Sequence, residues 1–373
     1  MDLPTLTISA ANGWMNQEDR FSGNIAGKEQ KNYTLLHKGE LSYNHGNSKL
    51  AKYGTVFSLQ SYKEALVPRV YHSFKAEKGS PDFIEYYFAT KLPDRELGKL
   101  ISSGARMDGL LNIGYNEFMG IQMLFPSVEE QKQISNYFRS LEHLITLHQQ
   151  KITLLTKLKK AMLEKMFPKK GTVIPEFRFN GFANAWEQRK LGNVAKFSKG
   201  SGYSKGDLIE SGTPIILYGR LYTKYETSIS EVDTYVEAKD GSVYSKGGEV
   251  IVPASGETSE DIARAATVDK SGVILGGDLN VVSPNEDINS AFLAISISHG
   301  NSQRELAKKA QGKSVVHIHN EEIKNLVVPF PAKAEQNKIV EYFSNLDNLI
   351  TLHQRKIDKL KNLKKAMLDQ MFI

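Results

Sequence analysis

Two stretches of the chain carry apolar residues at alternating steps of four and three, the spacing of a heptad seam. The first stretch lies within residues 127–168 and the second within residues 332–373. The spacing predicts one long helix in each stretch, about 55 Å in length at about 1.5 Å per residue. A solitary helix of this kind would expose its whole apolar stripe to water, so the two helices are expected to pair. The expected seam positions are Ile134, Phe138, Leu141, Ile145, His148, Ile152 and Leu155 in the first helix, and Ile339, Phe343, Leu346, Ile350, His353, Ile357 and Leu360 in the second.

The two helical stretches are copies of each other. Residues 130–167, EQKQISNYFRSLEHLITLHQQKITLLTKLKKAMLEKMF, return at 335–372 as EQNKIVEYFSNLDNLITLHQRKIDKLKNLKKAMLDQMF. The likeness continues upstream in register, where Ile113, Glu117, Phe125 and Pro126 match Ile318, Glu322, Phe330 and Pro331. The chain is therefore predicted to consist of two similar halves.

The segments between the helices have a different pattern. They are rich in Gly, Ser, Tyr, Val and Thr, with short alternating runs that end at glycine turns, which predicts strands and loops. Short helices are expected at residues 82–90 and 290–298. The fold class is thus α+β, with strand-rich domains over 1–126 and 186–331, helical regions over 127–168 and 332–373, and a linker over 169–185.

Composition narrows the class of protein. The chain has 373 residues, 40% hydrophobic and 24% charged, which is enough for two or three ordinary cores. The sequence contains no cysteine, so disulfides, thiolate nucleophiles and cysteine-ligated metals are excluded. No window approaches the roughly 20 apolar residues of a membrane span, and the start carries no secretory signal, so a cytoplasmic location is expected. The net charge of +6 and pI near 9.0 permit a polyanionic partner.

Several motifs together carry a family resemblance. They are PEFRFNGFANAWEQRKLGNVAKFSKGSG at residues 175–202, a Pro followed by Glu-Gln at Pro126/Glu130/Gln131 and Pro331/Glu335/Gln336, and the two copies of the long helix. In this arrangement the chain resembles the specificity subunits of type I restriction-modification systems. The resemblance covers nearly the whole chain.

The resemblance implies a fold and a set of partners. Two target recognition domains would each read one half of a bipartite DNA sequence in the major groove, and the repeated helices would pair as an antiparallel coiled coil. The spacer between the half-sites would not be read. The chain itself would be non-enzymatic and would bind no cofactor. Two methyltransferase subunits would use S-adenosylmethionine to methylate adenine, and two restriction subunits would use ATP and Mg.

One departure from the pattern concerns the first half. About 62 residues lie between Trp186 and the turn at Gly247, but only about 38 precede the matching turn at Lys38. The first recognition domain is therefore expected to be shortened at its N-terminus, either because the chain is trimmed or because it is a naturally reduced variant.

The sequence lacks the complete motif of each catalytic or metal site considered below. The glycines at residues 276–280 lack the strand, turn and helix order of a cofactor loop, and Lys313 has no glycine five residues before it, as a P-loop requires. His317 and His319 share one face of a possible strand, but no third metal ligand is evident. Asp82 and Glu85 do not have the spacing of a nuclease site. A non-catalytic chain without a metal is predicted.

Candidate DNA contacts are side chains in glycine-flanked loops that can bind phosphates or base edges. In the second domain they are Lys199, Ser201, Tyr203, Ser204, Lys205, Tyr218, Arg220, Tyr222, Lys224, Ser255, Glu257, Thr258, Ser259 and Lys313. In the first domain they are Asn12, Arg20, Tyr43, Asn44, Asn47, Ser48, Lys49, Lys52, Tyr53 and Arg106.

A different class of function remains open at this point. The chain could be a stand-alone DNA-binding or coiled-coil interaction protein that uses its helices to dimerise and never meets a methyltransferase. His148 and His353 would lie close together in an antiparallel pair, where a polar seam residue fixes the register.

Overall fold

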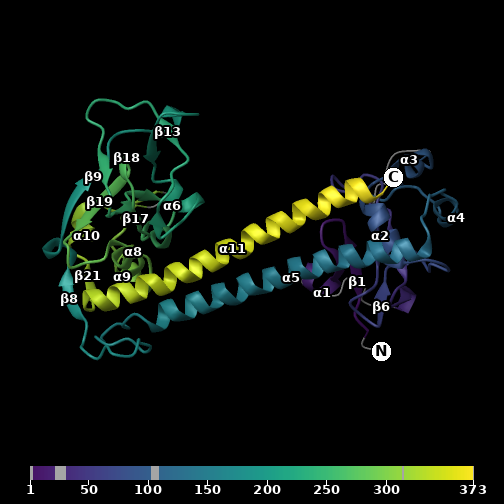
Figure 1. The fold of residues 1–373 in the computed structure, drawn as a ribbon, viewed down its shortest axis with the longest axis horizontal. Coiled ribbons are helices and arrows are strands. Elements are labelled where there is room, and N and C mark those ends of the chain that lie inside the picture. The colour runs from purple at the N-terminus through teal and green to yellow at the C-terminus, as the bar shows by residue number, and fades with distance from the viewer. Residues whose placement is uncertain (1–2, 22–30, 102–108, 313–314, 373) are drawn as a thin grey trace. The chain divides into compact units, whose positions relative to one another are not determined.

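The computed structural model describes residues 3–21, 31–101, 109–312 and 315–372. They divide into two units. Unit 1 comprises Met1–Gln150 and His353–Ile373, and unit 2 comprises Lys151–Leu352. Each unit therefore combines one strand-rich module with a part of both long helices, α5 (Val128–Lys165) and α11 (Lys333–Met371), drawn in teal and yellow in Figure 1.

The module of unit 1 consists of small antiparallel sheets and short helices. The sheets pair β1 (Leu6–Ser9) with β2 (Gly13–Asn16), β3 (Thr34–His37) with β6 (Glu64–Val67), and β4 (Leu41–Asn44) with both β5 (Thr55–Ser58) and β7 (His72–Phe74). The helices are α1 (Gln17–Phe21), α2 (Pro81–Ala89), α3 (Asp94–Lys99) and α4 (Tyr115–Met119). Alternate residues of β5 and β6 are buried, which is the period of two expected of strands with one face on a core.

The module of unit 2 is built on larger sheets. One sheet has the order β10 (Leu208–Ile209), β13 (Tyr235–Val236), β11 (Thr213–Ile216), β18 (Ser271–Leu275) and β14 (Tyr244–Lys246). A second has the order β12 (Ser228–Ile229), β17 (Ala266–Val268), β15 (Glu249–Pro253), β19 (Leu279–Pro284) and β9 (Ala195–Lys199). Two ribbons pair β16 (Ser255–Gly256) with β20 (Val316–His317), and β21 (Val327–Phe330) with β8 (Glu187–Lys190). The helices are α6 (Arg220–Thr223), α7 (Ser259–Ile262), α8 (Ser290–Ser298), α9 (Gly300–Ala307) and α10 (Asn320–Lys324).

The short helices α2 and α8 occupy equivalent places in the two modules, as the sequence predicted. Each begins at a side-chain cap: the Ser80 hydroxyl accepts from the Phe83 N–H, and the Asn289 side chain accepts from the Phe292 N–H. In unit 2, α8 packs on the sheet through β15 and β17, and Figure 1 shows it near β17 and α11. In both modules this helix lies against the long helix that follows it in the chain.

The expected seam residues of α5 and α11 are all buried or half-buried. Those of unit 1 pack with Leu360 and Phe372, and those of unit 2 with Leu155 and Met166. Leucines one step off the seam, such as Leu144 and Leu158, are exposed instead. The burial thus follows the heptad period of a two-helix coiled coil.

Contacts across the helix pair show that it is antiparallel. In unit 1 the Lys364 ammonium lies 2.6 Å from Glu142, and in unit 2 the Lys159 ammonium lies 2.5 Å from Asp347. Residue numbers rise along α5 as they fall along α11, and the two ion pairs are the same pair in the two copies of the repeat. The Nδ1 atoms of His148 and His353, also equivalent residues, are 2.9 Å apart. The α+β fold with an antiparallel coiled coil is therefore confirmed.

Candidate DNA-binding surfaces

Two of the predicted loops of unit 2 meet at one cleft of ≈ 750 Å³. One loop leads from β9 to β10 and the other contains α6. The segment between β12 and β13, and Asp278 before β19, also line the cleft. Among the predicted residues, the cleft is lined by Tyr203, Ser204, Lys205, Tyr218, Arg220 and Lys224.

Arg220 is held inside this cleft by acids rather than presented to solvent. Its Nη1 donates to the Asp233 carboxylate at 2.7 Å, and its Nη2 donates to Glu226 at 2.8 Å and to the Glu231 carbonyl at 2.7 Å. The side chain is only 8% exposed. Hydrogen bonds from Lys224 and Arg220 lower the pKa of Asp233 to about 2, so the carboxylate stays charged. The DNA contact at Arg220 stays a prediction: its two Nη groups are engaged in shaping the loop, and its Nε has no hydrogen-bond partner among the described residues.

The free side chains of the cleft are fewer than the sequence suggested. Lys205 is exposed and forms no ion pair with any residue that the structure describes. Tyr218 is exposed, with its ring at right angles to that of Tyr222. Tyr222 is half-buried and donates to the Ser255 carbonyl at 2.8 Å, which turns its hydroxyl away from solvent. Lys205 and Tyr218 are therefore the side chains available to a ligand.

Other predicted residues of unit 2 hold turns. The Ser201 hydroxyl accepts from the Val243 N–H at 3.1 Å. Ser204 and Asp207 cap one turn, and Thr258 caps α7 by accepting from the Asp261 N–H. These contacts fix loop shape. Lys199, at the end of β9, and Glu257 are exposed, and Ser259 donates to Glu260 at 2.9 Å.

Sequence reasoning missed the acidic and basic partners that organise the cleft. Lys239 and Arg264 lie far along the chain from the rings that they contact, whereas Asp233 lies 13 residues from Arg220 and 9 residues from Lys224. Lys239 lies 4.7 Å above the Tyr203 ring, and Arg264 lies above the rings of Tyr222 and Tyr225. No local motif marks these residues, because only the sheet topology brings them together.

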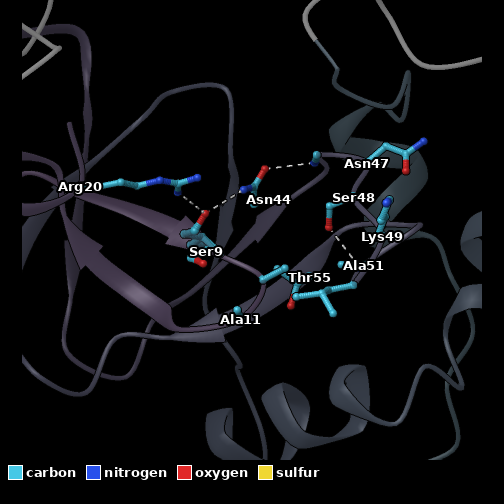
Figure 2. Close-up of a pocket in the computed structure, with 13 residues that line it drawn as sticks. Ser9, Ala11, Arg20, Asn44, Asn47, Ser48, Lys49, Ala51 and Thr55 are labelled. Atoms are coloured by element: carbon cyan, nitrogen blue, oxygen red, sulfur yellow. Dashed lines mark hydrogen bonds between the residues drawn. The ribbon is translucent and has the colours of Figure 1, made fainter. Parts of the chain in front are cut away.

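Unit 1 has a pocket of ≈ 450 Å³ where β1 approaches the loop between β4 and β5. Figure 2 shows Asn44 bonded to two backbone groups: its amide donates to the Ile8 carbonyl at 3.3 Å and its oxygen accepts from Gly46 N–H at 3.0 Å. Arg20 also donates to the Ile8 carbonyl, at 3.2 Å. The predicted residues that line the pocket are Arg20, Asn44, Asn47, Ser48 and Lys49.

Tyr43 does not belong to this surface. Its side chain is 0% exposed, its ring stacks on Phe118 at 4.2 Å, and its hydroxyl donates to the Tyr53 carbonyl. The expectation of a DNA contact at Tyr43 is corrected, because its position on β4 turns it into the core. Tyr53 is half-buried with Lys52 5.1 Å from its ring, and Asn12 is exposed in the turn between β1 and β2. Arg106 and Lys313 lie outside the described residues.

Within the described ranges, no group of three or more His, Asp or Glu residues is placed to hold a metal ion. His317 and His319 have parallel rings 6.4 Å apart, and His317 lies 3.2 Å from the Ser255 hydroxyl. Over the same ranges, no helix has the length and apolar character needed to cross a membrane.

The architecture defines a class of protein: strand-rich modules with loop-lined clefts alternate along the chain with the two helices of an antiparallel coiled coil. Residues 184–362 match the family model described as "Type I restriction modification DNA specificity domain". The resemblance of the chain to type I specificity subunits is therefore confirmed.

Known proteins agree with this assignment. The chain is 22% identical over 300 residues to the type I restriction enzyme MjaVIII specificity subunit of Methanocaldococcus jannaschii, covering 77% of this chain and 69% of the relative. The S subunit of a type I restriction-modification system from M. genitalium shares the fold with a TM-score of 0.55 at 13% identity, over 91% of this chain and 84% of that one. A chain from a structure on complex assembly and conformational transition of the type I R-M system matches with a TM-score of 0.51 at 15% identity, over 90% and 82%.

Proposed function

We propose that the chain is the DNA-recognition subunit of a type I restriction-modification complex and that each unit reads one half of a two-part DNA sequence. The observation that carries the proposal is the match of residues 184–362 to a DNA specificity domain, in which two loops converge on one cleft. The bases between the two half-sites are not read in this proposal. Of the alternatives, a stand-alone coiled-coil interaction protein explains the helix pair but leaves the clefts without a role. A stand-alone DNA-binding protein would use the clefts, and it differs from the proposal in never binding a methyltransferase.

In unit 2, the proposed roles follow from which groups are free. Lys199 and Lys205 bind phosphates, because their ammonium groups are exposed and no ion pair with a described residue satisfies them. Tyr218 packs against an exposed base edge or a thymine methyl group. Arg220 acts as a positioning residue that holds the loop of Tyr218 against Asp233.

In unit 1, the pocket offers amide and hydroxyl groups. Asn44 is used by the backbone, whereas Asn47 and Ser48 are exposed on the same loop. An asparagine amide can donate to and accept from an adenine edge, so Asn47 is the proposed base contact. Lys49, exposed beside it, is the proposed phosphate contact.

Partner recruitment is assigned to apolar patches on the helix pair. On the helix pair, the leucines exposed by 40% or more are Leu144, Leu147 and Leu363 in unit 1, and Leu154, Leu158, Leu349 and Leu352 in unit 2. All of them except Leu154, whose counterpart is Lys359, are equivalent under the repeat. Exposed apolar stripes of this kind favour further helices. We assign one methyltransferase subunit to each patch, and two restriction subunits complete the complex.

The chemistry lies with those partners in this proposal. The methyltransferase subunits use S-adenosylmethionine, and the restriction subunits use ATP and Mg, while this chain binds none of them. Its own contribution is the choice of DNA sequence.

The test is reconstitution. The purified chain, the methyltransferase partner, S-adenosylmethionine and a random DNA library are combined, and methylated adenines are located by sequencing. The expected result is a two-part motif that requires both proteins. Methyl transfer by the chain alone, or a motif without two parts, contradicts the proposal. Specific DNA binding without any association with the methyltransferase favours the stand-alone alternative.

The helix pair supplies a second test of the two-part site. One added heptad after Ile152 and one after Ile357 preserve the seam and lengthen the pair by about 10 Å. The unread spacer should then grow by roughly three base pairs at about 3.4 Å each, with both half-sites unchanged. A folded, active variant with the original spacer means that the helices do not set the distance.

A further inference from the structure

The cleft of unit 2 is lined by connections that cross between the two five-stranded sheets of the module. The β9–β10 loop, the α6 loop and the segment between β12 and β13 each join a strand of one sheet to a strand of the other. The turn of residues 276–278, with the sequence Gly-Gly-Asp, does the same between β18 and β19. This turn contributes one side chain to the lining of the cleft, that of Asp278.

The turn is fixed in place by backbone contacts on two sides. The Gly276 N–H donates to the carbonyl of Ile216, the last residue of β11 before the α6 loop, at 2.9 Å. On the other side, a Cβ on Gly277 would lie 3.0 Å from the Cα of Gly202, so a larger residue would push the turn away from the β9–β10 loop. The position of Asp278 is therefore set by its neighbours and not by its own side chain.

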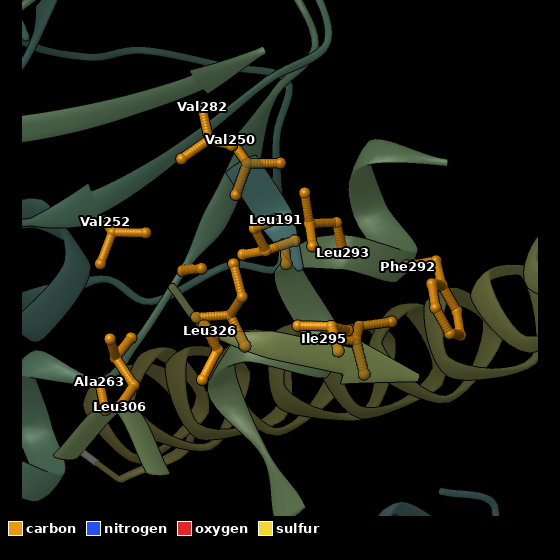
Figure 3. Close-up of a cluster of buried hydrophobic side chains, with 14 of the residues drawn as sticks. Leu191, Val250, Val252, Ala263, Val282, Phe292, Leu293, Ile295, Leu306 and Leu326 are labelled. Carbon is orange, nitrogen blue, oxygen red and sulfur yellow. The ribbon is translucent and has the colours of Figure 1, made fainter. Parts of the chain in front are cut away.

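The residues next to Asp278 are anchored in the module. The Asp278 carbonyl accepts from the Ala254 N–H at 2.8 Å, and Leu279, which follows, is 0% exposed. Further along β19, Val282 belongs to the buried cluster drawn in Figure 3. The side chain of Asp278 is exposed at the end of this buried strand. A side chain that recognises a particular atom needs such a rigid support.

The carboxylate of Asp278 does not have the structural role that is common for an aspartate in a turn. Such a side chain usually accepts from a backbone N–H two residues further on. Asp278 accepts no side-chain hydrogen bond from a described residue and forms no ion pair with one. The other carboxylate among the described lining residues, that of Asp233, is neutralised by Arg220 and Lys224. An acid without a cation repels phosphates, so Asp278 suits a DNA-binding cleft only where DNA supplies a donor to it.

We propose that Asp278 reads a base, with its carboxylate accepting a hydrogen bond from an amino group in the major groove, N4 of a cytosine or N6 of an adenine. These amino groups are the donors that bases display in that groove, and a carboxylate only accepts. Lys205 and Tyr218 line the same cleft, so a duplex that contacts them brings base edges to the carboxylate. The inference rests on the proposed DNA-recognition function and adds the residue that sets the preference at one base pair.

The test uses the reconstituted complex and the motif that the wild type produces. Asp278→Ala should relax the preference at one position of one half-site about tenfold and leave the other positions unchanged, as expected for the loss of a hydrogen bond to a charged group. Binding to DNA without the motif should stay equal or become stronger, because a negative charge is removed. Glu210→Ala removes an exposed acid of the same module that does not line the cleft, and this matched control should change neither quantity.

Modified bases identify the atom that is read. At the position affected by Asp278→Ala, N4-methylcytosine or N6-methyladenine carries a methyl group in place of the amino hydrogen that faces the groove. The modified base should weaken binding of the wild type about tenfold and leave binding of the variant unchanged. The 7-deaza form of the purine in the same base pair lacks an acceptor and keeps the amino group, so its effect should be equal for the two proteins.

The outcomes separate this inference from the proposed function. A wild-type motif that Asp278→Ala leaves intact at every position overturns the role of Asp278 and keeps the DNA-recognition function. Weaker binding of the variant to all DNA, with the same motif, assigns Asp278 to the fold and also overturns the inference. So does a methylated base that weakens binding of both proteins equally. If the wild type produces no motif, the proposed function is wrong and the inference is wrong with it.

Discussion

The two units attach their strand-rich modules to the long helices through one shared contact and one contact that differs. The shared contact is a glutamine in the first turns of the helix. Gln131 accepts from the Ser80 N–H at 3.1 Å and donates to the Pro126 carbonyl at 3.0 Å. In unit 2, Gln336 accepts from the Asn289 N–H at 2.8 Å and donates to the Pro331 carbonyl at 2.9 Å.

Beyond this clamp the attachments diverge. In unit 1, Arg139 donates to three carboxylates, those of Asp82 at 2.6 Å and of Glu85 and Glu142 at 3.0 Å. In unit 2 the equivalent residue is Ser344, which is exposed. Both junctions contain an aromatic cluster, formed by Phe167, Phe292 and Phe343 in unit 2 and by their equivalents Phe372, Phe83 and Phe138 in unit 1. The comparison teaches that the repeat preserves the clamp and the aromatic cluster, while the ionic network around Arg139 in unit 1 has no counterpart at Ser344.

The pKa values of the acids around Arg139 are shifted in opposite directions, although Arg139 lowers each of them. Burial alone would raise the pKa of Asp82 and of Glu142, but their bonds to Arg139, Lys364 and other donors outweigh it and lower both. For Glu85, burial prevails and its pKa is raised. On acidification, the stability from Asp82 and Glu142 is lost as pH falls through their folded pKa values, while Glu85 favours the folded state below its unfolded pKa. Acid therefore changes the stability of this junction in two opposite directions, which partly cancel.

The largest expected effect comes from removing Arg139. Arg139→Ala leaves Asp82 and Glu85 without their cation and Glu142 with Lys364 alone, and we expect unit 1 to lose about 3 kcal/mol. Ser344→Ala, at the same position of the repeat, should change the stability of unit 2 by no more than about 0.5 kcal/mol. Urea unfolding combined with hydrogen exchange resolves the two units. Equal effects of the two substitutions would show that the junctions do not differ in kind.

Particular residues show how far the sequence could predict this arrangement. The seam from Ile134 to Leu155 follows from the heptad spacing of apolar residues. Because this spacing is a local property of the sequence, the helix pair was predictable. Asp233 reaches Arg220 through strand pairing, and Tyr87 reaches Phe372 through packing between distant segments. Such contacts depend on topology, which short-range spacing does not determine. For that reason the sequence located the loops of the clefts but not which of their side chains are free.

A smaller effect is expected from acid on unit 2. Burial, together with the positive charges of Lys159 and Arg264, lowers the pKa of His299 to about 4. Because the folded pKa lies below the ordinary value of about 6.5, stability is complete above pH 6.5 and falls as pH decreases toward 4. By pH 5 unit 2 should lose about 2 kcal/mol.

His299→Asn is the matched variant, since asparagine is a good helix N-cap and does not titrate. Unfolding measured at pH 7 and at pH 5 should show a decrease for the wild type that this variant lacks in unit 2. An undiminished decrease in the variant assigns the acid sensitivity to another group.

The next effect concerns the cleft of unit 2. Arg220→Ala leaves Glu226 without its cation and Asp233 with Lys224 alone, which adds net negative charge near the cleft, repels phosphates and releases the loop. DNA binding should weaken by about 1–2 kcal/mol, while the preferred base at each position stays the same, because the guanidinium holds the loop and contacts no base. Binding to a set of single-base variants of the site measures both quantities. A relaxed preference at one position would restore Arg220 as a base contact.

The smallest effect is expected at Lys205, which is free where Arg220 is held. A lysine that binds one phosphate releases about one counterion, so Lys205→Ala should reduce the slope of log affinity against log salt by about 0.9. The loss should be the same for cognate and unrelated DNA, since a phosphate carries no sequence information. Lys224→Ala is the matched control, because that ammonium lies 2.8 Å from Asp233 and is already neutralised. Filter binding between about 50 and 200 mM salt measures the slopes. A slope that falls for Lys224→Ala and not for Lys205→Ala would mean that DNA displaces the acids, and that the bonded cations rather than the free one face the phosphates.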